Sequence, residues 1–129
     1  MKNVDEKLKI KYLKKAEDMV TIHNLGEKSA TEVIDFVKRH LMKQNRNSVS
    51  EQGFCNYRGI NDTKCAAGCL IPDEDYKPSM ERRLWKGLIR AYNFTDSHQK
   101  LIEELQNIHD SFEVSEWAEK IDALRLEFK

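Results

Sequence analysis

Basic and aromatic residues alternate through the middle of the sequence, where they could bind a phosphorylated ligand. Arginine and lysine neutralise phosphates, and aromatic rings stack on bases. The acids of "PDEDY", residues 72–76, could accept hydrogen bonds from a sugar or a base amine. A helical core with a basic surface would have the same composition, so the pattern is a hypothesis. It predicts a ligand site formed by Tyr57, Arg58, Lys64, Asp73, Glu74, Tyr76, Arg82 and Lys86.

Three cysteines, Cys55, Cys65 and Cys69, lie close together in the sequence and allow three interpretations. They could bind zinc, but structural zinc sites present paired Cys or His ligands, and the four histidines here are scattered. Cys65, next to Lys64, could be a nucleophile, but it lacks a recognisable catalytic motif. Small buried thiols that pack as apolar side chains fit the spacing best. We therefore predict no metal, no disulfide and no cofactor.

The acidic residues of the same region could also do chemistry. Asp73, Glu74 and Asp75, with Glu81, could bind magnesium or supply a general base. Consecutive acids after a proline are more often a solvated turn. The sequence also lacks the phosphate-binding loop, the dinucleotide fingerprint, the serine-hydrolase elbow and the zinc-protease motif. These observations favour a binding protein over an enzyme.

Composition limits the partners and the cellular location. The 129 residues carry 22 basic and 22 acidic side chains, so the formal net charge is zero. A neutral chain is unlike a dedicated nucleic-acid coat, although a local basic patch is still possible. The sequence has neither a long apolar run nor a signal peptide, which predicts a cytoplasmic protein without a membrane partner. The odd number of cysteines fits a reducing compartment.

The elements that must position these residues are mainly helices, because the chain has only five glycines and two prolines. The apolar periodicity predicts a basic first helix from about Asp5 to Met19 and a helix over 31–43 behind a Ser29–Glu32 capping box. It also predicts a possible helix over 78–92, a helix over 96–108, and a last helix capped by Ser115. The last two form a helical hairpin.

The segment from 48 to 80 is irregular in this prediction. It contains turn residues and a possible short β-hairpin, and "KCAAGCLI" could form a short helix before Pro72. The fold class is therefore mainly α: a compact helical domain with an irregular central segment. We predict two parts, a basic helix with its connector at 1–28 and a single helical domain at 29–129.

The stretch "CNYRGINDTKCAAGCLIPDEDYKPSMERRLW", with the helices on either side of it, resembles a family of small, mostly uncharacterised proteins of tailed phages and bacteria. The core pattern of that family is "C.YRG..G.KCA.G.LIPDE.Y...MEG", followed by a hairpin that contains "HD", matched here by His109 and Asp110. The resemblance covers roughly residues 31–128. Two positions depart from it, because Asp62 or Thr63 and then Arg82 stand where the family has glycine.

The resemblance implies a fold more than an activity. Its phage setting suggests an accessory protein that sequesters a nucleotide-derived host immune signal without catalysis. In that role Arg58, Lys64 and Arg82 would hold phosphates, and Tyr57 and Tyr76 would stack on bases. A protein–protein inhibitor of a host enzyme is the first alternative, and a small enzyme that uses Cys65 or the 73–74 acids is the second. A homo-oligomer is plausible on the same analogy.

Overall fold

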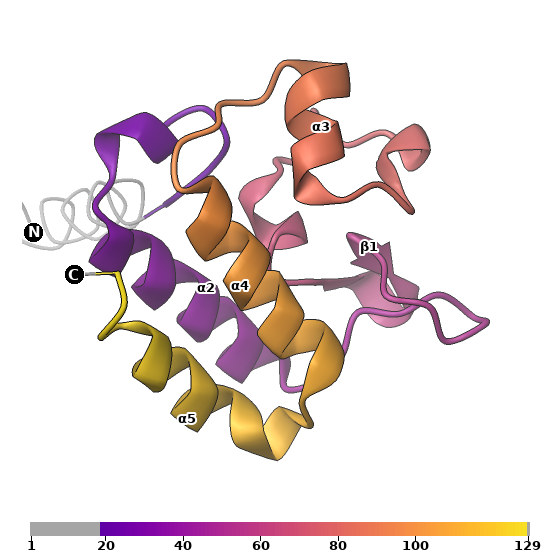
Figure 1. Cartoon of the computed structure of the whole chain (residues 1–129). Helices are drawn as coiled ribbons and strands as arrows, with labels where there is room; N and C mark the ends of the chain where they lie inside the picture. The colour runs from indigo at the N-terminus through magenta and orange to yellow at the C-terminus, as the bar shows by residue number, and fades with distance from the viewer. Residues whose placement is uncertain (1–18, 129) are drawn as a thin grey trace, which may run out of the picture.

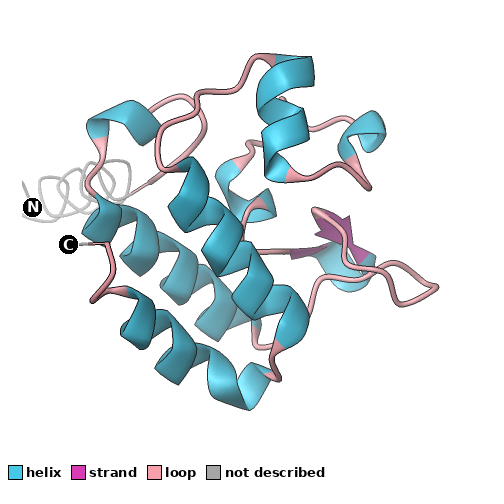
Figure 2. Ribbon diagram, in the orientation of Figure 1, coloured by secondary structure: helices cyan, strands magenta, loops and turns pink. Residues whose placement is uncertain are grey.

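The protein is built mainly from helices that pack around one apolar core. The computed structural model describes residues 19–128 (Figure 1). Helices α2, α4 and α5 lie side by side, and α3 packs against α4 (Figures 1 and 2). The predicted mainly α fold is therefore confirmed. The helices are α2 (Ala30–Gln44), α3 (Trp85–Tyr92), α4 (Gln99–Ser111) and α5 (Val114–Leu124).

Helix α2 begins and ends where its sequence predicts. Ser29 and Glu32 form the reciprocal capping box: the Ser29 hydroxyl accepts from the Glu32 N–H at 3.1 Å, and the Ser29 N–H donates to the Glu32 carboxylate at 2.9 Å. Val33 and Val37 are fully buried on the same face. Asn45 ends the helix in the left-handed conformation at φ 53°. The capping box and the apolar stripe together account for the helix.

Helices α4 and α5 form the predicted C-terminal hairpin, with a shorter connection than the sequence suggested. Only Phe112 and Glu113 separate the two helices. Glu113, rather than Ser115, caps α5 through a reciprocal box with Glu116. Trp117 is fully buried, and its indole N–H donates to the Phe112 carbonyl at 3.1 Å. This hydrogen bond fixes the angle of the hairpin because it joins the buried side chain to the connecting backbone.

The expected helix over 78–92 is split in two. A 3₁₀ turn, η4, covers Pro78–Met80, and α3 begins only at Trp85. Between them Arg82 takes a φ of 66°, which an α-helix does not allow. The 78–92 segment therefore places Arg82 before the helix, not on a helical stripe with Lys86.

The central segment contains the predicted short hairpin. Strands β1 (Arg58–Gly59) and β2 (Thr63–Lys64) are antiparallel, and Arg58 lies opposite Lys64. Two 3₁₀ turns, η2 (Ile60–Asp62) and η3 (Gly68–Leu70), also belong to the central segment. Another, η1 (Leu25–Glu27), precedes α2. The "KCAAGCLI" stretch thus forms a 3₁₀ turn rather than an α-helix, and Cys65 and Ala67 within it are buried.

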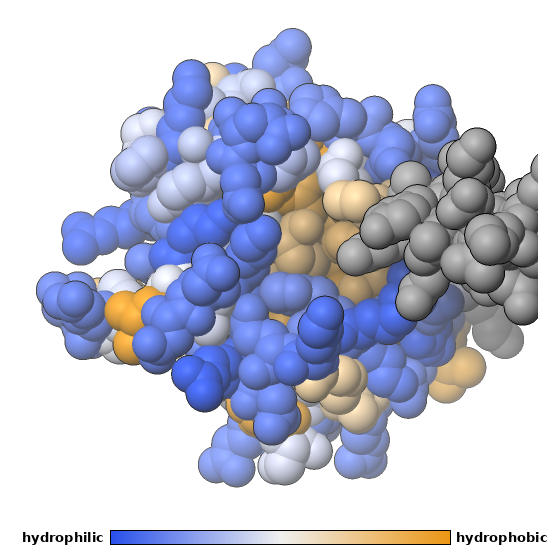
Figure 3. Space-filling view, turned by 180° about the vertical axis from the view of Figure 1, so that it is seen from behind, coloured by the Kyte–Doolittle hydropathy of each residue, from blue (hydrophilic) through white to orange (hydrophobic). Residues whose placement is uncertain are grey.

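The expected basic first helix lies outside the described residues, apart from its last residue. The connector after it joins the core, since Val20 and Leu25 are buried. Seen from behind, the surface is mostly hydrophilic, with apolar side chains gathered in a hollow near the centre of the view (Figure 3). No helix among residues 19–128 is long and apolar enough to cross a membrane.

Acidification is expected to destabilise the fold through His40 on α2. Its Nε2–H donates to the Lys64 carbonyl at 2.8 Å, and burial lowers the pKa of His40 although this hydrogen bond opposes the shift. The unfolded chain therefore binds more protons as the pH falls through about 6.5, and the free energy of unfolding decreases. Urea unfolding between about pH 7.5 and 5.5 measures the slope. The His40→Gln variant keeps an N–H donor and should show a shallower slope; parallel slopes would contradict this assignment.

Candidate functional site

Arg58, the basic residue at the centre of the predicted site, is bonded to the protein itself. Its Nη1 donates to the Gly68 carbonyl at 2.8 Å, and its Nη2 donates to the Ile71 carbonyl at 2.6 Å and to Asp73 Oδ1 at 3.1 Å. The guanidinium carbon lies 4.8 Å from the centre of the Tyr76 ring. Only 16% of the side chain is exposed. Arg58 therefore holds the central segment together.

Glu81 completes what we call the Arg58–Glu81 network, formed by these two residues with Lys64, Asp73 and Tyr76. The Glu81 carboxylate accepts from the backbone N–H of Tyr57 at 2.8 Å and of Arg58 at 3.0 Å. It also accepts from the Tyr76 hydroxyl at 2.7 Å. Burial, and then this hydrogen bond, raises the pKa of Tyr76 to about 12. One carboxylate thus fixes the start of β1.

The acidic turn lies at the edge of this network. Lys64 Nζ is 3.2 Å from Asp73 Oδ1, which Arg58 also contacts. The hydrogen bond and charge of Lys64, followed by the charge of Arg58, hold the pKa of Asp73 below its usual range. Glu74 is exposed. Arg58, Lys64 and Asp73, three of the residues predicted to bind a ligand, therefore lie together, and their charges pair with one another.

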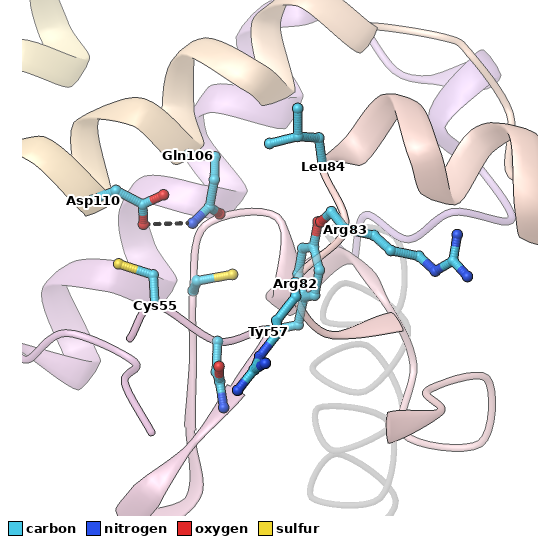
Figure 4. Close-up of a pocket in the computed structure, with 9 residues that line it drawn as sticks. Cys55, Tyr57, Arg82, Arg83, Leu84, Gln106 and Asp110 are labelled. Carbon is cyan, nitrogen blue, oxygen red and sulfur yellow. Dashed lines mark hydrogen bonds between the residues drawn. The ribbon is translucent and has the colours of Figure 1, made fainter. Parts of the chain in front are cut away.

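A groove lies between the start of α3 and one face of α4. It consists of two cavities of about 180 and 450 Å³, and both are lined by Tyr57, Leu84, Gln106 and Asp110. Figure 4 shows the residues that line the smaller cavity. We call it the α3–α4 groove. Of the eight residues predicted to bind a ligand, Tyr57, Arg82 and Lys86 line it.

The α3 side of the groove is cationic. The first N–H groups of an α-helix lack an intrahelical acceptor and carry a partial positive charge. In α3 the preceding residue, Leu84, provides no side-chain cap for them. Two exposed cations flank the groove: Lys86 lines the larger cavity, at the first turn of α3, and Arg82 lines the smaller one. Trp85 also lines the groove and is 3% exposed, yet its Nε1–H has no acceptor among the described residues. The α3 side thus combines a cationic helix start with a buried indole N–H for which residues 19–128 supply no acceptor.

The α4 side of the groove is acidic. Asp110 Oδ1 accepts from His109 Nδ1 and from Gln106 Nε2, each at 2.8 Å. Burial alone would raise the pKa of Asp110, but hydrogen bonds from His109, Cys55 and Gln106 outweigh it, so the pKa lies below its usual range. Asp110 is therefore an ionised carboxylate at neutral pH. Figure 4 shows the Arg83 side chain pointing away from this wall.

Cys55, His109 and Asp110 are the metal-ligating side chains that converge among residues 19–128; their ligand atoms lie within 4.8 Å of one another. The Ser48 N–H donates to His109 Nε2 at 3.0 Å, so Nε2 is the unprotonated nitrogen and Nδ1 carries the proton given to Asp110. A metal at Nδ1 would need the opposite tautomer, which would set two N–H groups against each other. The cluster is better described as hydrogen-bonded than as metal-binding.

The thiols in this region are kept protonated. Burial first, and then Asp110, raises the pKa of Cys55 to about 11. Burial also raises the pKa of Cys65, which is 1% exposed, and raises that of Cys69 to about 12. Cys69 donates to the Ala66 carbonyl at 3.0 Å. Cys65 is buried and Cys69 is half-buried, as expected of packed, unreactive thiols. Cys55 is exposed, so the prediction of buried thiols is wrong for that residue.

Sequence reasoning missed the α4 wall of the groove. Gln106 and Asp110 lie about fifty residues from Tyr57 along the chain, and their spacing resembles an ordinary helix surface. The sequence contains the pair His109–Asp110, but the spacing of these residues does not show that Asp110 lies near Tyr57. The protein-family models, the curated proteins and the solved structures include no significant match to this chain.

Proposed function

We propose that this chain is a non-catalytic binding protein for a nucleotide-like small molecule and that the α3–α4 groove is its binding site. One observation carries the proposal: the groove places a cationic helix start and an ionised carboxylate on its two sides. A nucleotide has the matching polarity, with phosphate at one end and hydrogen-bond donors at the other. The larger cavity, at about 450 Å³, falls in the range typical of small-molecule sites.

The contacts of such a ligand follow from the walls. Its phosphate would lie at the first turn of α3, near Lys86, where backbone N–H groups and the side-chain charge both favour an anion. Arg82 would contribute its charge from the adjoining smaller cavity. Its base would lie against the exposed side chain of Leu84, next to the edge of the buried Trp85 ring. Its donors would reach Asp110. This arrangement retains three residues of the sequence prediction, Tyr57, Arg82 and Lys86. Its acidic hydrogen-bond acceptor is Asp110 on α4 instead of Asp73 or Glu74.

The backbone at Arg82 supports a functional role for its side chain. Its φ of 66° lies in the region that favours glycine, and an arginine there costs about 1 kcal/mol or more. The phage-type pattern that this sequence resembles has glycine at the same position. An arginine in a glycine position, beside a cavity and a helix start, suits anion binding. The presence of Arg82 in place of glycine supports a preference for anionic ligands in this protein.

Sequestration is the form of binding that we propose. The thiols at the groove, Cys55 and Cys65, are held protonated, which suits a site that binds a ligand without reacting with it. Together with the resemblance to small phage and bacterial proteins, this supports a nucleotide-derived host immune signal as the ligand class. The protein would then act by lowering the free concentration of that signal.

A protein partner is the second candidate. Leu84 is 81% exposed and Phe54 is 62% exposed, which is unusual for large apolar side chains. An inhibitor of a host enzyme could use them as contact residues. A nucleotide that raises the melting temperature would favour the first proposal, whereas a flat nucleotide panel would favour this one.

Removing the two cations of the groove is expected to weaken nucleotide binding about 30-fold, since two charge-assisted contacts of about 1 kcal/mol each are lost. A thermal-shift panel of mononucleotides, cyclic nucleotides, cyclic oligonucleotides and ADP-ribose derivatives identifies the ligand class. Calorimetry then compares the wild type with the Arg82→Ala/Lys86→Ala variant. Arg90→Ala, an exposed change in the last turn of α3, is the matched control. Unchanged affinity in the double variant would overturn the site.

A further inference from the structure

The oxygen atoms of Asp110 have different surroundings. Both N–H donors that reach this carboxylate from the described side chains, His109 Nδ1–H and Gln106 Nε2–H, end on Oδ1. Asp110 lines both cavities of the groove. The Cys55 thiol also donates to this carboxylate. Because each carboxylate oxygen has two lone pairs, Oδ2 keeps at least one of them for a donor on a bound molecule.

The two donors are themselves fixed in orientation. The Ala67 N–H donates to Gln106 Oε1 at 2.8 Å, so the Gln106 amide must present its nitrogen to Asp110. The Ser48 N–H fixes the His109 tautomer in the same way. His109 is fully buried and stacks on Trp117, with 5.3 Å between ring centres. Two buried backbone groups thus decide which Asp110 oxygen is engaged.

We infer that Asp110 is a specificity-determining residue that selects a nucleobase bearing an exocyclic amine, such as adenine or cytosine, over its keto counterpart. The inference rests on the proposed function. An amine would donate a charge-assisted hydrogen bond to Oδ2. A keto oxygen at the same place would face a carboxylate, and both groups would lose water without gaining a partner.

The wild-type protein tests this with three ligands that differ at one position of the base. AMP carries the amine, purine riboside 5′-monophosphate carries hydrogen and IMP carries the keto oxygen. AMP is expected to bind about tenfold more tightly than either of the others, the effect of one hydrogen bond to a charged group. CMP and UMP repeat the comparison for a pyrimidine, and calorimetry gives the affinities.

The Asp110→Asn variant makes a sharper test. His109 and Gln106 both donate to the atom at Oδ1, so the asparagine must place its oxygen there and its NH₂ at the position of Oδ2. The α4 side of the groove then presents an N–H donor instead of an acceptor. The preference is therefore expected to reverse, with IMP bound more tightly than AMP. Glu119→Gln is the matched control, because Glu119 is an exposed carboxylate on α5 that lines neither cavity, and its change should leave the AMP preference in place.

The outcomes separate this inference from the proposed function. Equal binding of all three purine ligands by the wild type, or an unreversed preference in Asp110→Asn, would overturn the role of Asp110 alone. The absence of binding to any nucleotide of the panel would overturn the proposed function. The wild-type comparison needs no variant, so a folding defect in Asp110→Asn, detected by circular dichroism, leaves the test in place.

Discussion

Replacing Arg58 with methionine is expected to lower the free energy of unfolding by about 3 kcal/mol, because the change leaves buried acceptors without a donor. The carbonyls of Gly68 and Ile71 would lose the guanidinium, and the Asp73 carboxylate would lose one of its two cations. Methionine keeps much of the apolar stem, so the loss reports the polar contacts. Urea unfolding followed by circular dichroism measures it.

Arg82→Met is the matched control for this prediction. Arg82 is exposed, and its substitution should change the free energy of unfolding by no more than about 0.5 kcal/mol. Equal stabilities of the two variants would contradict the structural role of Arg58. A variant with alanine at Arg58 and Lys64 would have a disturbed fold, because both side chains bond to the central segment. Loss of ligand binding in that variant would therefore not identify a binding site.

Gly68→Ala is expected to destabilise the protein by about 2 kcal/mol, through overpacking against a backbone that cannot move freely. A Cβ at position 68 would overlap the carbonyl oxygen of Tyr57 and lie 3.0 Å from its Cα. Tyr57 is in turn held by Glu81 through its N–H. The η3 turn would have to separate from the start of β1, and thermal unfolding would show the loss.

Gly87→Ala provides a control of opposite sign. Gly87 lies in α3, and its added Cβ would meet only the Cβ of Arg83, at 3.6 Å, which is ordinary contact. Alanine in a helix is favoured over glycine by about 0.5–1 kcal/mol, so this variant should be slightly more stable than the wild type. If Gly68→Ala is also neutral or stabilising, the close approach of η3 to Tyr57 is wrong.

Local sequence determined the long helices. The α2 capping box needs only Ser29 and Glu32, three residues apart, and the buried faces of α2, α4 and α5 recur at helical spacing. Such signals lie within one or two turns of chain and act in the same way in any fold. The helix ends were less predictable: α5 is capped by Glu113, and α4 begins at Gln99 rather than near Asp96.

Tertiary contacts determine the conformation of the segment from 78 to 92. Its sequence permits one helix, but Glu81 is bonded to the backbone of Tyr57 and Arg58, and the Tyr57 hydroxyl donates to the Arg83 carbonyl. These contacts join residues more than twenty positions apart. They hold the chain in a non-helical path until α3 begins at Trp85.

The candidate site divides in the same way. Residue types alone indicated a polar, basic and aromatic centre, and the structure does place Arg58, Lys64, Asp73 and Tyr76 together. Which of these charges faces another part of the protein and which faces a cavity depends on contacts that spacing does not encode. Arg58 reaches carbonyls ten and thirteen residues away, whereas Asp110 reaches the groove only because α4 packs beside Tyr57. The sequence determined the chemistry available, and long-range packing determined where it is exposed.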